Sequence, residues 1–565
     1  MTSISFQRAL PLLLVPMLAQ AQATTPGALP AKRAPQPTTA AITAGDLMSR
    51  LYLFADDSLM GRDVGTEGHV KATEYLAREV KRMGLKPAGE NGTFFQTLPL
   101  KTRRVDRGST LSVGGTSLAI GRDWGIGGGE SVTVENGRLL YAGVFGDSAA
   151  SLPAAQLQGR IVAYRLPLNN NAIGASIQSP GVRPAGAAGV LFIVPSQARG
   201  LLGFVMQGGT RMADSSAAVD ARLFVTDSAA QTLFGKATTD LVPGVESAPF
   251  ALKATVEMTP VPFAGRNVVA ILPGSDPKLR TQYVAVGAHS DHVGMARRPV
   301  DHDSTLIFNR IVRPGGAEDS DKMGTPEQFT QVNTELAEWR KTHPPRLDSI
   351  YNGADDDGSG SVAVLEVAEF LAAQKVKPKR STLFVWHAGE EKGLWGSAYF
   401  TEHPTVPRDS IVAQLNMDMV GRGAAGDVTG LTKEGKELRG GPDYLQLVGS
   451  RRLSTGLGDL VESVNTTGKH GFTFDYAMDA NGHPMNIYCR SDHYEYAKWG
   501  IPVVFFTTGG HSLYHQLTDE AQYIDYPRLQ RVSRLVADLA GKIGNAAARP
   551  VVDQPKLDPR GSCKQ

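Results

Sequence analysis

The chain has 565 residues, 41% of them hydrophobic, and its 58 Lys and Arg against 56 Asp and Glu give a formal net charge of +2. A chain of this length exceeds what one hydrophobic core supports, so about two or three domains are expected. The near balance of charge excludes a broadly basic surface, and we expect neither a nucleic acid nor a membrane surface as a partner.

The N-terminus has the pattern of a secretory signal peptide. Residues 1–23 combine a basic residue, Arg8, with a short apolar run at 9–18 and small residues at 19–23. The apolar run is too short to cross a bilayer, although a buried N-terminal helix is an alternative. We therefore expect removal of residues 1–23, no membrane span, and an exported protein that is periplasmic or secreted.

Changes in composition predict the order of the domains. Residues 24–43 are rich in Pro, Ala and Thr, which predicts a flexible leader. Residues 44–125 begin with apolar positions at helical spacing and form the first part of the main domain. Residues 126–258 alternate short β-like runs with Gly, Ser and Ala turns, which predicts a β-rich inserted domain. The main domain resumes at 259–548, and a polar C-terminal tail occupies 549–565.

The second part of the main domain alternates buried strands with helices. Apolar runs predict strands at 267–272, 283–288, 382–386, 412–417 and 503–507. Helices are expected at 361–374 and 527–542. Runs this apolar are typical of a sheet covered on both faces. The predicted fold class is α/β, a three-layer sandwich around a mostly parallel mixed sheet, with the β-rich domain inserted.

Residues with metal-binding side chains follow these strands. Because the carboxyl ends of parallel strands meet at one edge of a sheet, such residues can converge there. Zinc binds imidazole nitrogen and carboxylate oxygen, and one carboxylate can bridge two ions. Singly, a His after a strand or a Glu pair in a turn is more often a hydrogen-bonded or solvated group. The residues that follow strands are His289, Asp291, His292, Glu390, Glu391, Asp418, Tyr514 and His515, and the stretch before the expected helix at 361–374 adds Asp356.

The stretch around Asp356 also fits a calcium-binding loop. Its matching positions are Asp355, Asp357, Ser359, Gly360 and Glu366. That interpretation requires a helix directly before Asp355, and Pro344-Pro345 and Asn352-Gly353 argue against one. It also leaves the other motifs unexplained, so Asp356 is better explained as a metal-bridging carboxylate.

Five motifs in chain order resemble metallopeptidase family 28, the co-catalytic zinc exopeptidases that include bacterial aminopeptidases. They are GAHSDHVG, GADDDGSG, GEEKGLWGS, LNMDMVGR and YHQLTDE. Residues 59–89 resemble the N-terminal segment of exported bacterial members, and 126–258 resemble the protease-associated (PA) domain inserted in several of them. The resemblance covers roughly residues 45 to 545 and implies that 44–125 and 259–548 form a zinc peptidase domain.

The resemblance implies two Zn²⁺ per chain. One zinc would be bound by His289, Asp356 and Asp418. The other would be bound by Asp356, Glu391 and His515, so Asp356 would bridge the two ions.

The resemblance also implies catalytic roles. Glu390 would be the general base acting on a zinc-bridging water, and Asp291 would orient His289. Tyr514 would donate to the developing oxyanion. A cis peptide is expected after Asp356. Asp492, in the stretch RSDHYEY, is a weaker candidate near the pocket.

The function implied is an exported zinc aminopeptidase that hydrolyses N-terminal residues from peptides. A carboxypeptidase or dipeptidase on the same scaffold, a glutaminyl cyclase and a non-catalytic binding protein are the alternatives. One departure from the family is the long separation of His289 and Asp356, which contains the segment 296–350. A helix is predicted there at 325–341, capped at Thr325. The segment 296–350 could fold over the site and narrow specificity, or pack elsewhere. Its role, residue preference, oligomeric state and the pairing of Cys489 with Cys563 stay open.

Overall fold

The computed structural model describes residues 32–565 apart from 148, 150, 169–172, 174, 175, 177–181, 199, 207 and 214–220. The predicted signal peptide at 1–23 lies outside the described residues, and so does the start of the predicted leader. Within the described part of the chain, no helix is both long and apolar enough to cross a membrane.

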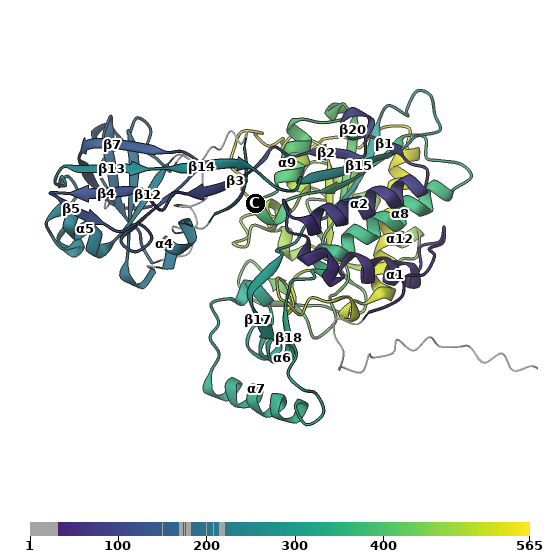
Figure 1. The fold of residues 1–565 in the computed structure, drawn as a ribbon. Coiled ribbons are helices and arrows are strands. Elements are labelled where there is room, and N and C mark those ends of the chain that lie inside the picture. The colour runs from purple at the N-terminus through teal and green to yellow at the C-terminus, as the bar shows by residue number, and fades with distance from the viewer. Residues whose placement is uncertain are drawn as a thin grey trace, which may run out of the picture.

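A nine-stranded mixed sheet forms the centre of the main domain (Figure 1). Strand β16 (Tyr283–His289) is parallel to β19 (Ser381–His387) and to β20 (Ile411–Met417), and β20 is parallel to β25 (Val503–Thr507). The carboxyl ends of these strands therefore lie at one edge, and all five strands expected from apolar runs are present. In spatial order the sheet contains β1 (Lys86–Pro87), β15 (Arg266–Leu272), β19 (Ser381–His387), β16 (Tyr283–His289), β20 (Ile411–Met417), β25 (Val503–Thr507), β23 (Tyr444–Val448) and β24 (Thr473–Asp475), with β2 (Phe95–Thr97) also paired to β15.

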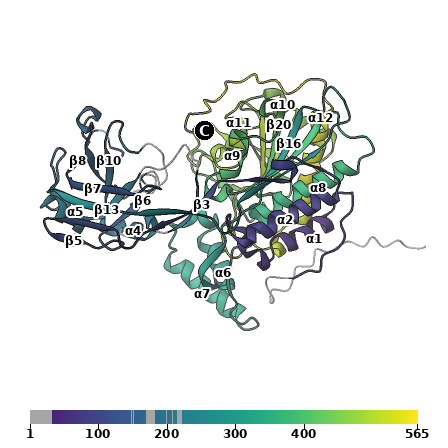
Figure 2. The ribbon, with the colours of Figure 1, turned by 45° about the horizontal axis from the view of Figure 1, so that its top comes forward.

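Helices pack on both faces of this sheet. Side chains alternate along a strand, so Val284 and Val286 of β16 face one hydrophobic core while Ala285 faces another. The first core includes helices α1 (Ala44–Phe54), α2 (Glu67–Arg82), α8 (Gly360–Ala373), α10 (Thr455–Thr467) and α12 (Tyr526–Asn545). The second includes α9 (Trp395–Glu402) and α11 (His493–Ala497). Figure 2 shows these two groups on opposite sides of β16 and β20. The helices predicted at 361–374 and 527–542 are confirmed as α8 and α12.

A β-rich domain with its own core stands beside the main domain (Figure 1). Two antiparallel strands, β3 (Leu100–Val105) and β14 (Val256–Pro260), connect it to the main domain, and β11 (Gly209–Met212) also pairs with β3. One sheet has the order β6 (Trp124–Gly127), β12 (Arg222–Thr226), β10 (Gly189–Val194), β9 (Ile161–Arg165) and β8 (Leu139–Val144). The other has the order β5 (Thr116–Leu118), β4 (Thr110–Val113), β13 (Phe250–Ala254) and β7 (Val132–Gly137). Helices α4 (Gly200–Val205) and α5 (Asp227–Phe234) complete the domain. Strands β4 and β5 of its sheets precede residue 126, the position at which the sequence predicts that the inserted domain begins.

The segment 296–350 folds as a small unit, called the insert below. Its helices α6 (His302–Val312) and α7 (Pro326–Trp339) pack together through Ile307, Val312 and Val332. Strands β17 (Met295–Asp301) and β18 (Leu347–Ile350) pair at its base, and Figure 1 shows α7 projecting away from the main domain. The helix predicted at 325–341 is confirmed as α7, which begins after a capping box formed by Thr325 and Gln328.

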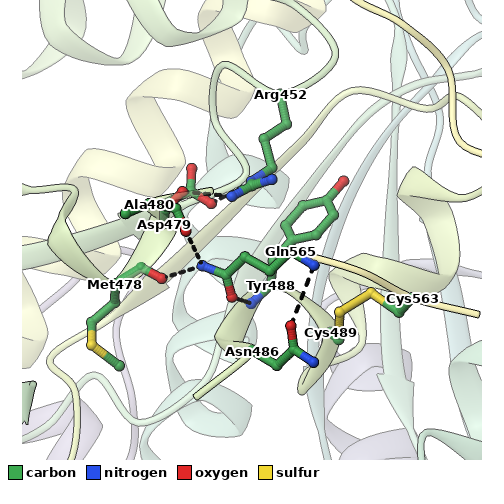
Figure 3. The surroundings of a disulfide bond; sticks show 9 residues. All are labelled: Arg452, Met478, Asp479, Ala480, Asn486, Tyr488, Cys489, Cys563 and Gln565. Carbon is green, nitrogen blue, oxygen red and sulfur yellow. Dashed lines mark hydrogen bonds and ion pairs between the residues drawn. A yellow bond between two sulfur atoms is a disulfide. The ribbon is translucent and has the colours of Figure 1, made fainter. Parts of the chain in front are cut away.

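The C-terminal tail is fastened to the main domain. A disulfide joins Cys489 to Cys563, which answers the pairing question that the sequence left open (Figure 3). Gln565 accepts a hydrogen bond from the Tyr488 backbone N–H at 3.0 Å and donates to the carbonyl oxygen of Ala480 at 3.2 Å. The remaining short strands, β21 (Val428–Leu431) and β22 (Glu437–Arg439), form a separate two-stranded ribbon.

Candidate metal centre

The carboxyl edge of the central sheet gathers the residues singled out in the sequence. His289 is the last residue of β16, and Asp418 directly follows the end of β20. Glu390 and Glu391 begin a short 3₁₀ turn after β19, and His515 lies in the loop beyond β25. Parallel strands that end at one edge thus bring together residues that are far apart in the sequence.

Asp356 enters the site from the loop before α8. The backbone N–H groups of Asp355 and Asp356 donate to the Asp519 carboxylate at 3.0 and 3.2 Å. Asp357 accepts from the backbone N–H of His289 at 3.1 Å, so this loop is tied to the end of β16. The peptide bond between Asp356 and Asp357 is cis, as expected from the sequence.

The two carboxylate oxygens of Asp356 face different histidines. Oδ1 lies 3.1 Å from His289 Nε2, which is also 3.7 Å from Asp418 Oδ1. Oδ2 lies 2.9 Å from His515 Nε2, which is 2.8 Å from Glu391 Oε2. We call the set His289, Asp356 and Asp418 the first cluster; the second cluster contains Asp356, Glu391 and His515.

His292 lies against the second cluster, and the sequence did not predict it as a ligand. Its Nδ1 lies 2.7 Å from Glu391 Oε1 and 3.8 Å from Asp356 Oδ2. The four donor atoms of His292, Asp356, Glu391 and His515 fall within 4.8 Å of one another. The available signal was the motif His289-Ser-Asp-His292, which carries a second imidazole three residues after the first.

The donor atoms fit metal ions. Among the described residues, the buried atoms without a hydrogen-bond partner include His289 Nε2, His292 Nδ1, Asp356 Oδ2 and Glu391 Oε1. Buried polar atoms are nearly always hydrogen-bonded, so a convergent group of unpartnered ones indicates a missing partner. Imidazole nitrogen with carboxylate oxygen is a donor set that zinc takes.

Electrostatics distinguish Glu390 from the carboxylates of the clusters. Burial raises the pKa of Glu390 well above its ordinary value, and the negative charges of Asp418 and Glu391 add to this effect. For Asp356, burial alone would raise the pKa, but His289 and His515 outweigh it and hold the pKa well below the usual range. Glu390 Oε2 is 4.0 Å from His289 Nε2, beside the clusters without belonging to either.

Asp291 contacts both His289 and Glu390. Its Oδ1 accepts the backbone N–H of Glu390 at 3.1 Å and lies 3.7 Å from His289 Nδ1. The nearer partner of His289 Nδ1 is the Asp291 backbone carbonyl oxygen, at 3.2 Å. The orienting contact to His289 therefore comes from the main chain of Asp291, while its side chain holds the turn that carries Glu390.

Tyr514 and Asp492 lie next to the clusters. The Tyr514 ring stacks on His515 with ring centroids 4.1 Å apart, and its hydroxyl is 3.4 Å from Arg490 Nη2. Arg490 also pairs with Glu318 of the insert. Asp492 belongs to neither cluster: its Oδ2 lies 3.3 Å from His387 Nδ1.

One region of the chain, which contains the site, matches a known peptidase family. Residues 267–540 match the family model described as Peptidase family M28. The matched region contains every residue of both clusters as well as Glu390 and Tyr514.

Similar proteins include several peptidases. Leupeptin-inactivating enzyme 1 of Streptomyces exfoliatus is 41% identical over 78 residues, 13% of this chain. An aminopeptidase of Pseudomonas aeruginosa is 36% identical over 102 residues, and leucine aminopeptidase 1 of Coccidioides posadasii is 33% identical over 161 residues, which are 16% and 27% of this chain. The matches span only 18%, 19% and 36% of these relatives' own lengths.

Solved structures resemble the chain over most of its length at low identity. A zinc aminopeptidase from Bacillus subtilis aligns at 16% identity with a TM-score of 0.47, covering 92% of this chain and 100% of the other. An aminopeptidase from Aneurinibacillus sp. strain AM-1 aligns at 16% identity with a TM-score of 0.46, covering 91% and 97%.

Proposed function

We propose that this protein is an exported aminopeptidase of family M28 with two zinc ions, which hydrolyses N-terminal residues from peptides. The observation that carries the proposal is the carboxylate of Asp356, shared between two donor clusters with 3.1 Å to His289 and 2.9 Å to His515. A carboxylate shared in this way could bind two metal ions at once. The M28 match over 267–540 supports the reaction class.

In this proposal His289, Asp356 and Asp418 hold one zinc, and the second cluster holds the other. Zinc bound there would supply Lewis-acid chemistry, making a water more acidic and polarising the substrate carbonyl. The residues of the chain orient these donors and shield them from solvent. Ser491 Oγ, for example, donates to Asp418 Oδ2 at 2.6 Å and so fixes the carboxylate that faces His289.

Glu390 is the proposed general base. It takes a proton from the attacking water and passes it to the nitrogen of the departing amine. Its pKa, raised mainly by burial, makes its carboxyl group a better proton acceptor than an exposed Glu. Asp291 positions the Glu390 backbone, and the Tyr514 hydroxyl is the proposed donor to the oxyanion.

A carboxypeptidase or dipeptidase is the second candidate, and Arg490 favours it. The Arg490 guanidinium lies 3.4 Å from the Tyr514 hydroxyl, and a cation there could bind a substrate carboxylate. Glu318 neutralises part of this charge, which favours the aminopeptidase.

Export, the inserted PA domain and the three-layer sandwich belong to the same proposal. The disulfide between Cys489 and Cys563 supports export because disulfides persist in oxidising compartments. Helices on both faces of the central sheet support the three-layer arrangement. A β-rich domain joined through β3 and β14 supports the PA assignment.

The test is mass spectrometry of a defined peptide mixture after incubation with the zinc-loaded protein. Half of the peptides carry acetylated N-termini. Stepwise loss from free N-termini only is the expected result. Trimming of C-termini in both halves would replace the aminopeptidase with the carboxypeptidase, and ammonia loss from N-terminal Gln would indicate a cyclase. An unchanged mixture would contradict the enzymatic proposal.

A further inference from the structure

We propose that His292 is a fourth protein ligand of the second metal, so that the two metal sites differ in affinity. The inference rests on the proposed function only in taking both clusters to bind metal ions. It assigns a role to a residue that sequence reasoning did not select.

The geometry of His292 is that of a ligand and not that of a hydrogen-bond donor. Its Nδ1 is 2.7 Å from Glu391 Oε1, yet within the described structure neither atom has a hydrogen-bond partner. A ring N–H that donated to this oxygen would point at it. An imidazole nitrogen and a carboxylate oxygen this close, without hydrogen-bond alignment, are placed as two ligands of one ion would be.

The spacing of the donors matches a zinc ion at that point. Tetrahedral donors with bonds of about 2.0–2.2 Å lie roughly 3.4 Å from one another. In the second cluster the separations are 2.7 and 3.8 Å from His292 Nδ1 and 2.8 and 2.9 Å from His515 Nε2, which bracket this value. The two imidazole rings meet edge to face at 74°, with centroids 5.4 Å apart.

The surroundings of His292 fix its ring in place. The residue is fully buried, and its backbone N–H donates to the Arg62 carbonyl oxygen at 3.4 Å. The ring lies against the backbone of Gly353, where a Cβ would be 2.5 Å from ring atoms Cγ and Cδ2. Gly353 has φ 54°, a conformation that glycine adopts readily. The imidazole is therefore preorganised for binding.

A fourth donor makes the clusters unequal. The first cluster offers three protein donors, His289, Asp356 and Asp418, while the second offers four with His292. Three-ligand zinc sites keep an open position, whereas four-ligand sites are closed by protein. We therefore expect the second site to fill first and to retain its metal when a chelator has emptied the first.

Metal content after graded chelation tests the unequal affinity. The zinc-loaded protein is dialysed against increasing chelator, and zinc per chain is measured by mass spectrometry. The wild type should pass through a plateau at one zinc per chain. Asp418→Asn, which damages the first site, should bind one zinc per chain, the tightly held ion of the second site. His292→Ala should lose the plateau, with second-site affinity reduced by more than about 100-fold, the upper end of losses when an outer-shell partner is removed.

Paramagnetic NMR with cobalt separates a ligand from a hydrogen-bond donor. In Asp418→Asn loaded with one Co²⁺, two strongly shifted imidazole N–H resonances are expected, from His292 and His515. The double variants that add His292→Ala or His292→Phe should show one; the Phe ring keeps the packing on Gly353. Circular dichroism verifies that the variants are folded.

A single shifted resonance before and after substitution of His292 would overturn the assignment, and so would chelation curves that His292→Ala leaves unchanged. Neither experiment measures peptide turnover. Failure of the inference is therefore distinguishable from failure of the proposed aminopeptidase activity.

Discussion

Arg62 Nη2 donates to the carbonyl oxygen of Gly353 at 2.9 Å, although 291 positions separate the two residues in the sequence. The same buried guanidinium donates to the carbonyl oxygens of Asn352 at 2.5 Å, Phe54 at 3.0 Å and Ser290 at 3.2 Å. Arg62 thus connects the N-terminal segment to the loop that carries Asp356 and to the end of β16.

Replacing Arg62 with Ala should therefore lower the free energy of unfolding by about 3 kcal/mol or more. Several buried carbonyl groups lose their donor, and each unsatisfied group costs about 1–3 kcal/mol. Arg62→Lys should recover little, because one ammonium cannot replace the planar fork. Urea unfolding measures the change. Arg78→Ala, at an exposed position of α2, should stay within about 0.5 kcal/mol; an equal loss in both variants would contradict the proposed role of Arg62.

The sequence was sufficient to predict the strands and the residues at their ends. Val284 to Ala288 form one apolar run because β16 is buried on both faces, and His289 must then lie at the sheet edge. Arg62 and His292 were not predictable in the same way. Arginine is normally exposed, so a buried Arg62 has no local signal. The contact of His292 with Glu391 depends on how the loop after β16 turns, which spacing alone does not specify.

The insert packs on the loop that carries His515, a question that its sequence left open. The Ala317 backbone N–H donates to the Tyr514 carbonyl oxygen at 3.0 Å, and Asn309 Nδ2 donates to Gln516 Oε1 at 2.9 Å. His302 Nε2 lies 3.3 Å from Glu520 Oε1. These contacts brace the loop from outside, so a change in the insert should alter the site.

Gly316→Ala tests this coupling. A Cβ there would lie 2.7 Å from the Tyr514 carbonyl oxygen, and φ of +61° disfavours a side chain by roughly 1–2 kcal/mol. The displaced loop should lower kcat/KM by about tenfold or more while the fold persists. Gly315→Ala is the matched control, because the atoms nearest to its Cβ, at 3.2 Å and beyond, belong to the flexible Asp319 side chain and not to backbone. Steady-state kinetics on one peptide should separate the two variants; equal activities would mean that the insert does not brace the site.

Glu390→Gln should keep metal and lose turnover. The amide preserves the shape of the side chain but accepts no proton, and general acid–base catalysis contributes about 10²–10⁴-fold. Zinc content should match the wild type because Glu390 belongs to neither cluster. Glu391→Gln should instead bind zinc more weakly. Normal kcat in zinc-loaded Glu390→Gln would remove the base assignment.

His493 should make the protein sensitive to acid. Burial lowers the pKa of His493 to about 3, whereas the unfolded chain protonates it near 6.5. The neutral, buried His493 contributes its full stabilisation above pH 6.5, and this contribution is lost as the pH falls towards 3. Between pH 7 and pH 5 the free energy of unfolding should fall by about 2 kcal/mol. His493→Phe should flatten this part of the stability curve. Phe505→Leu removes part of the packing on the His493 ring, whose centroid lies 4.7 Å from that of Phe505, and should shift stability without changing its pH dependence.

The disulfide between Cys489 and Cys563 should stabilise the protein by holding the tail in place. It closes a separation of 74 residues, and bonds of this kind contribute about 2–4 kcal/mol, chiefly by restricting the unfolded chain. Cys563→Ser should lower the melting temperature, and reduction should lower that of the wild type to the same value. Reductant should leave Cys563→Ser unchanged, because Cys489 is then the one remaining cysteine and the variant has no disulfide to reduce. A wild type insensitive to complete reduction would mean that the hydrogen bonds of Gln565, and not the disulfide, hold the tail.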